Sequence, residues 1–424
     1  MLKFNPFKPG SIVHPGMFAG RLEEINALEN SLFQTKNKNP SHFVIHGERG
    51  IGKSSLLMLL YCFATGEFES LFNQKYNFLA LNVELDPNDN YSNILSKIAR
   101  EFERVLALNE AYRTKLSDIW NFLTKWEVLG VKYQRERLPP ETLLEELTEK
   151  FITVCNRLGK AIDGIYVFID EADKPPASAN LGEFVKVFTE RLTKRECLNI
   201  GVGIVGISTV LKKLRISHES SVRILQSIEL GPLLYEERKQ VVTKGLTEAN
   251  RKNTYKTEIN DNALDTIANI SEGYPHFIQQ YAYSSFEADI NHIIEMNDVI
   301  DGLFKEKGAL NQLGLRYFEN WYSGEIFSDD YRQVLQIIAS NENQYTTRKE
   351  IIDKSDLKKH TVDNALTTLK KKNIIIPKKG RRGEYKLPSR SFAAWICAFK
   401  IAKHINKSSA SQVKKNEAGL GLNS

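Results

Sequence analysis

The sequence predicts an α/β fold: a parallel-sheet core, then a helical lid, then a C-terminal winged helix. Three observations carry this prediction. Short apolar runs alternate with helical stretches in the first half of the chain, a wholly helical pattern follows, and the last fifth is strongly basic. A length of 424 residues suits two or three domains. The expected boundaries are 1–232 for the core, 233–310 for the lid, 311–405 for the winged helix and 406–424 for a disordered tail.

Five runs rich in apolar residues are the predicted strands of the core. Their nearly continuous apolar character is typical of strands that helices cover on both faces, as in a parallel sheet. Residues 111–140 interrupt the pattern, are rich in aromatic residues, and are predicted to be an insertion or a lid over the core. The predicted strands are His42–His46, Asn77–Leu85, Ile165–Asp170, Asn199–Ile207 and Ile224–Leu230.

Composition excludes several classes of protein. With 42% hydrophobic and 26% charged residues, the chain has ample material for globular cores and is not disordered as a whole. The longest apolar run, Leu56–Ala64, is much shorter than the ~20 residues of a membrane span. Four scattered cysteines form no CxxC pair, so neither a zinc site nor a disulfide framework is predicted. We expect a cytoplasmic protein that does not bind membranes.

Charge is distributed unevenly along the chain. Residues 345–424 hold 19 Lys and Arg against 6 Asp and Glu, a net charge of +13. The whole chain carries +6, so residues 1–344 carry −7. This asymmetry is typical of a separate module that binds a polyanion, and the alternative is a solvated basic surface without a ligand.

A phosphate-binding loop is predicted directly after the first strand. Residues 47–54 read GERGIGKS and match G-x-x-x-x-G-K-[ST] without a mismatch, and a helical run follows. Backbone N–H groups of such a loop converge on phosphate oxygens at a helix N-terminus. We expect Lys53 to reach the β- and γ-phosphates of ATP and Ser54 to ligate Mg²⁺. The predicted nucleotide contacts are Gly47, Glu48, Arg49, Gly50, Ile51, Gly52, Lys53, Ser54 and Ser55.

Two carboxylates end the third predicted strand. Asp170 follows five apolar residues and is predicted to hold Mg²⁺ through water. Glu171 is predicted to orient and deprotonate the water that attacks the γ-phosphate. Asp173 follows closely, and the sequence favours a helix cap over a catalytic role for it.

Two further candidates have open alternatives. Ser208, together with Thr209, ends the fourth strand and either points a hydroxyl at the attacking water or caps the next helix. Arg223 precedes the last strand and either acts as an arginine finger in a neighbouring protomer's site or forms an ordinary salt bridge.

These elements, in this order, resemble the AAA+ ATPases, specifically the origin-recognition/initiator-like branch and its signalling (STAND) relatives. Residues 18–24 (FAGRLEE) look like the box that precedes the first strand in that group, and residues 230–233 (LGPL) look like the junction into the lid. The resemblance implies that Gly20 and Arg21 lie near the adenine. Residues 270–279 (ISEGYPHFIQ) resemble a lid segment, which implies nucleotide contacts for Pro275 and His276.

The chain departs from the replication initiators of that branch at two positions. Initiators place an arginine in the lid segment as a second sensor, where this chain has His276, and no asparagine stands at the first-sensor position. Both departures favour a prokaryotic switch-type ATPase.

The basic C-terminal segment has the pattern of a winged helix. Helices are predicted over Tyr331–Ala339, from Thr347 and from about Leu357 to Lys372, followed by strands at Asn373–Pro377 and Glu384–Leu387. The third helix and the strand-connecting tip carry the side chains best placed for DNA. The predicted DNA contacts are Lys358, Lys359, His360, Thr361, Asn364, Lys378, Lys379, Arg381 and Arg382.

Two functions compete at this point. The first is a self-associating, ATP-dependent DNA-binding switch, acting in mobile-element targeting, genome maintenance or anti-phage defence, with ATP and Mg²⁺ as its ligands. The second is a signalling ATPase whose winged helix binds a protein partner and for which DNA is irrelevant.

Overall fold

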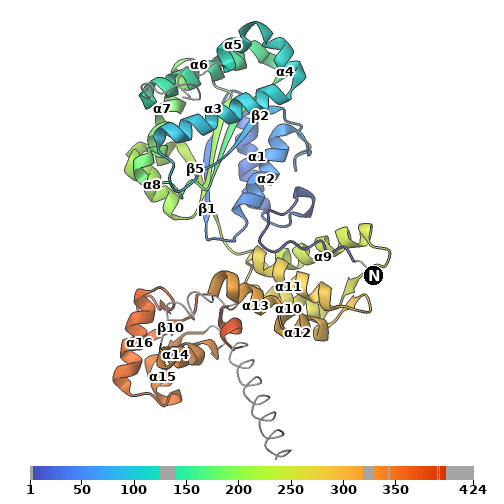
Figure 1. Cartoon of the computed structure of the whole chain (residues 1–424), viewed down its shortest axis with the longest axis vertical. Helices are drawn as coiled ribbons and strands as arrows, with labels where there is room; N and C mark the ends of the chain where they lie inside the picture. The colour runs from blue at the N-terminus through green and yellow to red at the C-terminus, as the bar shows by residue number, and fades with distance from the viewer. Residues whose placement is uncertain are drawn as a thin grey trace, which may run out of the picture. The chain divides into compact units, whose positions relative to one another are not determined.

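The computed structural model describes residues 3–124, 139–318, 328–341, 344–388, 390 and 392–397. The chain divides into two compact units (Figure 1), one formed by Gly10–Pro232 and the other by Met1–Pro9 together with Leu233–Ser424. The predicted tail, 406–424, and part of the predicted insertion, 125–138, lie outside the described residues. No helix within the described ranges is both long and apolar enough to cross a membrane.

A five-stranded sheet in the order β2–β3–β4–β1–β5 forms the centre of the first unit, and every neighbouring pair in it is parallel. The predicted parallel core is therefore confirmed, and each of the five strands lies within two residues of its predicted ends. The strands are β1 (His42–Gly47), β2 (Phe78–Glu84), β3 (Gly164–Asp170), β4 (Ile200–Gly206) and β5 (Leu225–Leu230).

Helices cover both faces of this sheet, which explains why its strands are apolar throughout. Alternate residues of a strand face opposite sides. On one side Phe43, Tyr166 and Phe168 stack on one another, and on the other Val167 joins a core with residues of α3, α6 and α7. Figure 1 shows helices on both sides of the sheet. The helices of this unit are α1 (Leu22–Lys36), α2 (Lys53–Thr65), α3 (Tyr91–Leu108), α4 (Glu110–Lys115), α5 (Trp120–Thr124), α6 (Pro140–Leu158), α7 (Leu181–Lys194) and α8 (Thr209–Ser217), with short 3-10 turns η1 (Pro15–Met17), η2 (Ser117–Ile119), η3 (Gly159–Ala161), η4 (Ala177–Ala179) and η5 (Glu219–Ile224).

Gly203 allows Phe43 to pack across the sheet, and replacing it tests this packing. The two residues are paired in the β1–β4 ladder, and a Cβ at position 203 would lie 2.3 Å from the Phe43 ring carbon Cζ. We expect Gly203→Ala to destabilise the first unit by about 1–3 kcal/mol, as overpacking of a core does. A melting curve should shift down by roughly 2–4 °C per kcal/mol. The matched control is Gly231→Ala, where a Cβ meets nothing within 4 Å and the melting temperature should not change.

The described part of the predicted insertion is packed against the core of the first unit. Leu116 and Leu123 are buried in the same cluster as Phe102 of α3 and Phe151 of α6. Residues 111–124 therefore contribute to the stability of the α3–α6 layer.

The second unit begins with helices, as the sequence predicts for the lid, and adds a short parallel pair of strands that the sequence did not reveal. Residues 3–9, which the sequence analysis grouped with the core, belong to this unit. Phe7 is buried beside Gly245 and Phe286, and the Lys3 ammonium lies 2.6 Å from the Asp289 carboxylate. The elements are α9 (Tyr235–Lys252), β6 (Glu258–Ile259), α10 (Asp261–Ile270), α11 (Pro275–Ala288), β7 (Ile293–Ile294), α12 (Met296–Phe304), α13 (Ala309–Leu313) and the π-helical turn η6 (Gly314–Phe318).

In the described residues of the basic part of this unit, three helices (α14 to α16) are interleaved with three short strands, and residues 392–397 are again helical. Thr347 and Glu350 form the capping box that the sequence predicts, with the Thr347 hydroxyl accepting the Glu350 N–H. The strand order is β8–β10–β9, and both pairings are antiparallel. The sequence did not predict β8, because its two residues become a strand only by pairing with β10. The elements are α14 (Asp329–Ala339), β8 (Thr346–Thr347), α15 (Arg348–Lys354), α16 (Lys359–Lys371), β9 (Ile376–Pro377) and β10 (Glu384–Lys386).

Candidate nucleotide-binding site

The candidate site lies at one edge of the sheet in the first unit, where parallel strands end together. The loop after β1 carries residues 48–52, and β3 ends at Asp170. Strand β4, which lies between β1 and β3 in the sheet, leads to Ser208. Because all the strands are parallel, their carboxyl ends meet at this edge, which is where ligands bind in open α/β sheets.

The loop between β1 and α2 is built for close approach of its backbone to a ligand. Gly50 and Gly52 have φ values of 77° and 96°, in the left-handed region that glycine adopts without strain. Lys53 is the first residue of α2, and its ammonium donates to the carbonyls of Gly47 (3.2 Å) and Glu48 (2.8 Å). Burial lowers the Lys53 pKa, against the opposing influence of Asp173, Asp170 and Glu171. The ammonium is thus held over the loop beside three carboxylates.

Ser54 and Asp170 are brought together although 116 positions separate them in the chain. The Ser54 hydroxyl lies beside the Asp170 carboxylate, which accepts the Glu171 N–H at 2.7 Å. Burial raises the Asp170 pKa, although the Ser54 hydroxyl, the Glu171 N–H and the charge on Lys53 each lower it. A hydroxyl beside a buried carboxylate fits Mg²⁺, which prefers oxygen ligands and is held by few protein groups together with water and phosphate. No cluster of three or more His, Cys, Asp or Glu side chains suited to a metal occurs in the described ranges.

Glu171 is held in an unusual backbone conformation next to Asp170. Its φ of 55° is in the left-handed region, where non-glycine residues are uncommon and strain gathers at functional sites. Burial raises its pKa, the charge of Lys174 lowers it, and the charges of Asp170 and Asp173 raise it. The Lys174 ammonium lies 3.9 Å from the Glu171 carboxylate and 3.2 Å from that of Glu84. The sequence analysis did not single out Lys174 or Glu84, because their proximity depends on the pairing of β2 with β3.

Asp173 links the loop that follows β3 to the segment that follows β4. Its carboxylate accepts the Ile207 N–H at 2.8 Å, and its backbone carbonyl accepts the Lys213 ammonium. It caps none of the described helices, so the cap that the sequence favoured is not found. Asp173 instead fixes the segment leading to Ser208 relative to Asp170 and Glu171.

The two open candidates are both accessible. Ser208 is exposed, and it occupies the N-cap position of α8 without a side-chain capping bond, so the capping alternative is not realised. Arg223 lies in η5, is exposed, and forms no ion pair or hydrogen bond with any described residue. The salt-bridge alternative for Arg223 therefore finds no support within the described chain.

Gly20 and Arg21 precede α1, and Arg21 contacts the phosphate loop. The Arg21 guanidinium is buried and donates to the carbonyls of Ile51 (2.9 Å) and Gly231 (2.8 Å). Nearby, the Ser55 hydroxyl accepts the Val13 N–H at 3.2 Å. The bond to Ile51 gives Arg21 a role in holding the loop, and the contact of Gly20, Arg21 and Ser55 with a nucleotide remains a prediction.

Pro275 and His276 belong to the second unit, at the start of α11, where Pro275 occupies the first turn of the helix. The His276 ring lies 4.1 Å from the Phe277 ring, measured between centroids. Their predicted contact with the nucleotide remains a prediction.

Comparison with known proteins bears on the fold and on the first unit's domain type. Residues 17–190 match the family model described as AAA ATPase domain. None of the curated proteins matches the chain. The Aeropyrum pernix ORC2 protein, in its ADPNP–ADP complexes, is 14% identical, with a TM-score of 0.51 and coverage of 94% of this chain and 99% of that one.

Two other solved structures are similar over most of the chain. They are CDC6p from Pyrobaculum aerophilum (14% identity, TM-score 0.48, covering 95% of this chain and 98% of that one) and the Walker-type ATPase PABY2304 of Pyrococcus abyssi (16%, 0.48, 89% and 96%). The family match, together with the likeness to ORC2, whose low identity bears on the fold alone, leads to one conclusion: the chain has a P-loop AAA+ fold, with an AAA ATPase domain in residues 17–190.

Proposed function

We propose that the protein is an ATP-binding and ATP-hydrolysing switch that self-associates and binds DNA through a C-terminal winged helix. The observation that carries the proposal is the convergence of Lys53, Ser54, Asp170 and Glu171 at one edge of the sheet. These are the residue types that ATP hydrolysis uses, and their convergence at one edge of the sheet supports the proposal.

Each of the four side chains has a distinct task. Lys53 contributes positive charge to the β- and γ-phosphates, and Glu171 accepts a proton from the attacking water. Ser54 and Asp170 would hold Mg²⁺, which supplies neutralisation of the phosphate charge when bound. Asp173 and Lys174 position the loop that carries Glu171, through the bonds to Ile207 and Glu84.

Self-association is proposed from the exposure of Arg223. A cation without a partner among the described residues is available to the γ-phosphate bound by a neighbouring protomer, and such arginine fingers contribute about 10³–10⁵-fold to the hydrolysis rate.

A mixing experiment tests the shared site. Glu171→Gln and Arg223→Ala should each be nearly inactive alone, because one lacks the base and the other lacks the finger. A mixture of the two variants should recover part of the ATPase rate, since some interfaces then combine an intact Glu171 with an intact Arg223. A mixture as inactive as its components would show that Arg223 does not act across protomers.

DNA binding is proposed from the basic end of the chain. The arrangement of α14, α15 and α16 with an antiparallel β8–β10–β9 sheet supports the winged helix. Lys358, Lys359, His360 and Asn364 are exposed, whereas Thr361 is half-buried. This face of α16 is thus accessible for contacts with a DNA groove.

The four cations of the wing tip are not equivalent. Lys378 and Arg381 both pair with Glu384, at 2.5 Å and 3.5 Å, whereas Lys379 and Arg382 are exposed and have no ion pair in the described chain. We expect Lys379→Ala/Arg382→Ala to weaken DNA binding at every sequence and to reduce the salt slope by about two, one per lost phosphate contact. The matched control, Lys378→Ala/Arg381→Ala, should have a smaller effect, because Glu384 already offsets these charges. Equal losses in the two variants, measured by fluorescence anisotropy, would contradict this distinction.

The ion pairs of the wing also give support to the second candidate, a signalling ATPase whose winged helix binds a protein partner. Glu384 in the wing and Asp363 in α16, which pairs with Arg348 at 2.6 Å, reduce the positive charge of the surface. If neither Lys379→Ala/Arg382→Ala nor Lys378→Ala/Arg381→Ala changes the affinity for DNA, this second candidate is favoured.

A further inference from the structure

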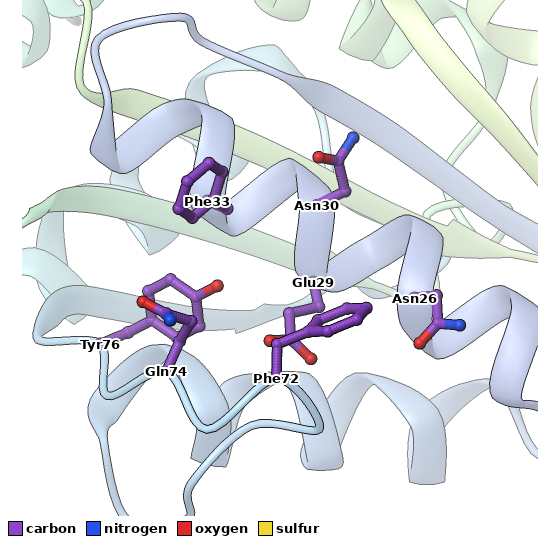
Figure 2. Close-up of a pocket in the computed structure, with 7 residues that line it drawn as sticks. All are labelled: Asn26, Glu29, Asn30, Phe33, Phe72, Gln74 and Tyr76. Carbon is purple, nitrogen blue, oxygen red and sulfur yellow. The ribbon is translucent and has the colours of Figure 1, made fainter.

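A pocket separate from the phosphate site lies in the first unit, between α1 and the segment that precedes β2. Its cavity volume is about 280 Å³. Figure 2 shows Asn26, Glu29, Asn30 and Phe33 coming from α1, and Phe72, Gln74 and Tyr76 coming from the facing segment. The four helical positions recur at i, i+3, i+4 and i+7, so they share one face of α1.

Glu29 is the central polar group of this pocket. It is 1% exposed, and one carboxylate oxygen, Oε2, accepts the Leu71 N–H at 3.1 Å. The other oxygen, Oε1, is buried without a hydrogen-bond partner in the described chain. A buried acceptor without a partner is costly, and native structures rarely keep one without a reason. This oxygen therefore requires a hydrogen-bond donor that the described part of the chain does not provide.

Tyr76 adds a second unsatisfied group to the same pocket. It is 1% exposed, and its hydroxyl has no hydrogen-bond partner in the described chain. Burial and the nearby charge of Glu29 raise the Tyr76 pKa, so the phenol stays neutral and can donate or accept.

The rest of the lining defines the chemistry of a ligand. Glu29 is the one charged residue among the lining side chains, and the others are amides and aromatic rings. Phe33 and Phe72 are 43% and 58% exposed, so their rings are accessible from the solvent. The nearby Lys36 does not supply the missing donor to Glu29, because its ammonium lies 3.2 Å from Asp163 and donates to the Lys75 carbonyl. A carboxylate beside aromatic rings is suited to a cation with apolar substituents.

We propose that this pocket binds an ammonium or guanidinium group on a short apolar stem. The cationic group donates to Glu29 Oε1, and the stem lies against the rings of Phe33 and Phe72. The same chemistry has two sources, a free amine or the side chain of a lysine or arginine in another protein, and the experiment separates them.

The test uses the full-length protein and three probes. Butylguanidinium represents the free cation, the capped peptide acetyl-Ala-Arg-Ala-amide represents a partner's side chain, and butylurea is a neutral control of similar shape. Binding is measured by calorimetry and by ligand-observed NMR. We expect at least one of the two cations to bind and butylurea to bind at least about tenfold more weakly, because a hydrogen bond to a charged group is worth about that factor or more.

Variants then locate the binding. Glu29→Gln keeps an acceptor for the Leu71 N–H but removes the charge, and it should weaken cation binding about tenfold or more. Phe72→Ala changes a side chain that is largely exposed, so it tests the pocket even where Glu29→Gln destabilises the fold. The matched control, Glu69→Gln, removes an exposed charge from the same segment and should leave cation binding unchanged.

The outcomes decide the proposal. Binding of the peptide alone supports a partner's side chain, and binding of butylguanidinium, with or without the peptide, supports a free small-molecule cation. Failure of both cations to bind, equal binding of butylurea, or unchanged cation affinity in both Glu29→Gln and Phe72→Ala would overturn it. ATP binding by Glu29→Gln should match the wild type, so this result is distinguishable from a failure of the nucleotide site.

Discussion

Lys53→Ala should lower the affinity of the protein for ATP by about 100-fold or more. The Lys53 ammonium is held over the phosphate loop, with the carbonyls of Gly47 and Glu48 as its partners, and no other lysine occupies that loop. Removing one partner of a desolvated charge pair costs about 2–5 kcal/mol, and each 1.4 kcal/mol is a factor of ten. Titration with a fluorescent ATP analogue in the presence of Mg²⁺ measures the change.

Lys75→Ala is the matched control for this prediction, because Lys75 is exposed in the same unit. It should bind ATP as the wild type does. A melting curve of Lys53→Ala checks that the loop substitution leaves the unit folded. Retention of wild-type ATP affinity by folded Lys53→Ala would contradict the assignment of the phosphate site.

Glu171→Gln should bind ATP normally but hydrolyse it about 10²–10⁴-fold more slowly, the contribution that a general base makes. Glutamine keeps the size of the side chain and is no worse suited to the backbone conformation at this position, but it cannot accept a proton. Burial raises the pKa of both Glu171 and Asp170. Wild-type hydrolysis should therefore decline on acidification at a higher pH than an exposed carboxylate would produce, because the ionised forms are the active ones. Single-turnover hydrolysis across a pH series measures both effects.

Glu190→Gln provides the control for Glu171→Gln. Glu190 pairs with Lys186 on the surface of α7, and removal of the Glu190 charge should leave the rate of ATP hydrolysis unchanged. Hydrolysis by Glu171→Gln at the wild-type rate would remove Glu171 from the role of base and direct attention to Asp173 or Glu84.

The parts of the structure that depend on local sequence were predictable. Strands covered on both faces are apolar throughout, so β1 and β3 could be found from composition alone, with the phosphate loop and Asp170 at their ends. The capping box of Thr347 and Glu350 is likewise a short-range pattern, and the structure contains it.

The parts that depend on long-range packing could not be predicted. Strand β8 exists because two residues pair with β10, and Lys174 approaches Glu84 only because β2 lies beside β3. The burial of Phe7 in the second unit depends on contacts with residues more than 200 positions away. No local pattern in the sequence encodes these contacts.

The candidate site shows the same division. Lys53, Ser54, Asp170 and Glu171 were identified from their motifs. The connection from Asp173 to the Ile207 N–H, and the pairing of Lys378 and Arg381 with Glu384, were not. Both depend on where a loop folds back, which charge patterns alone do not specify.

The central claim is that ATP controls the binding of DNA, and fluorescence anisotropy of the full-length protein with labelled duplex DNA tests it most directly. The salt concentration is fixed at about 0.1 M, because phosphate contacts make the affinity depend steeply on salt. We predict that ATP with Mg²⁺ changes the affinity for DNA and that Lys53→Ala abolishes this change. Absence of DNA binding both with and without ATP would contradict the account and favour a protein partner for the C-terminal module.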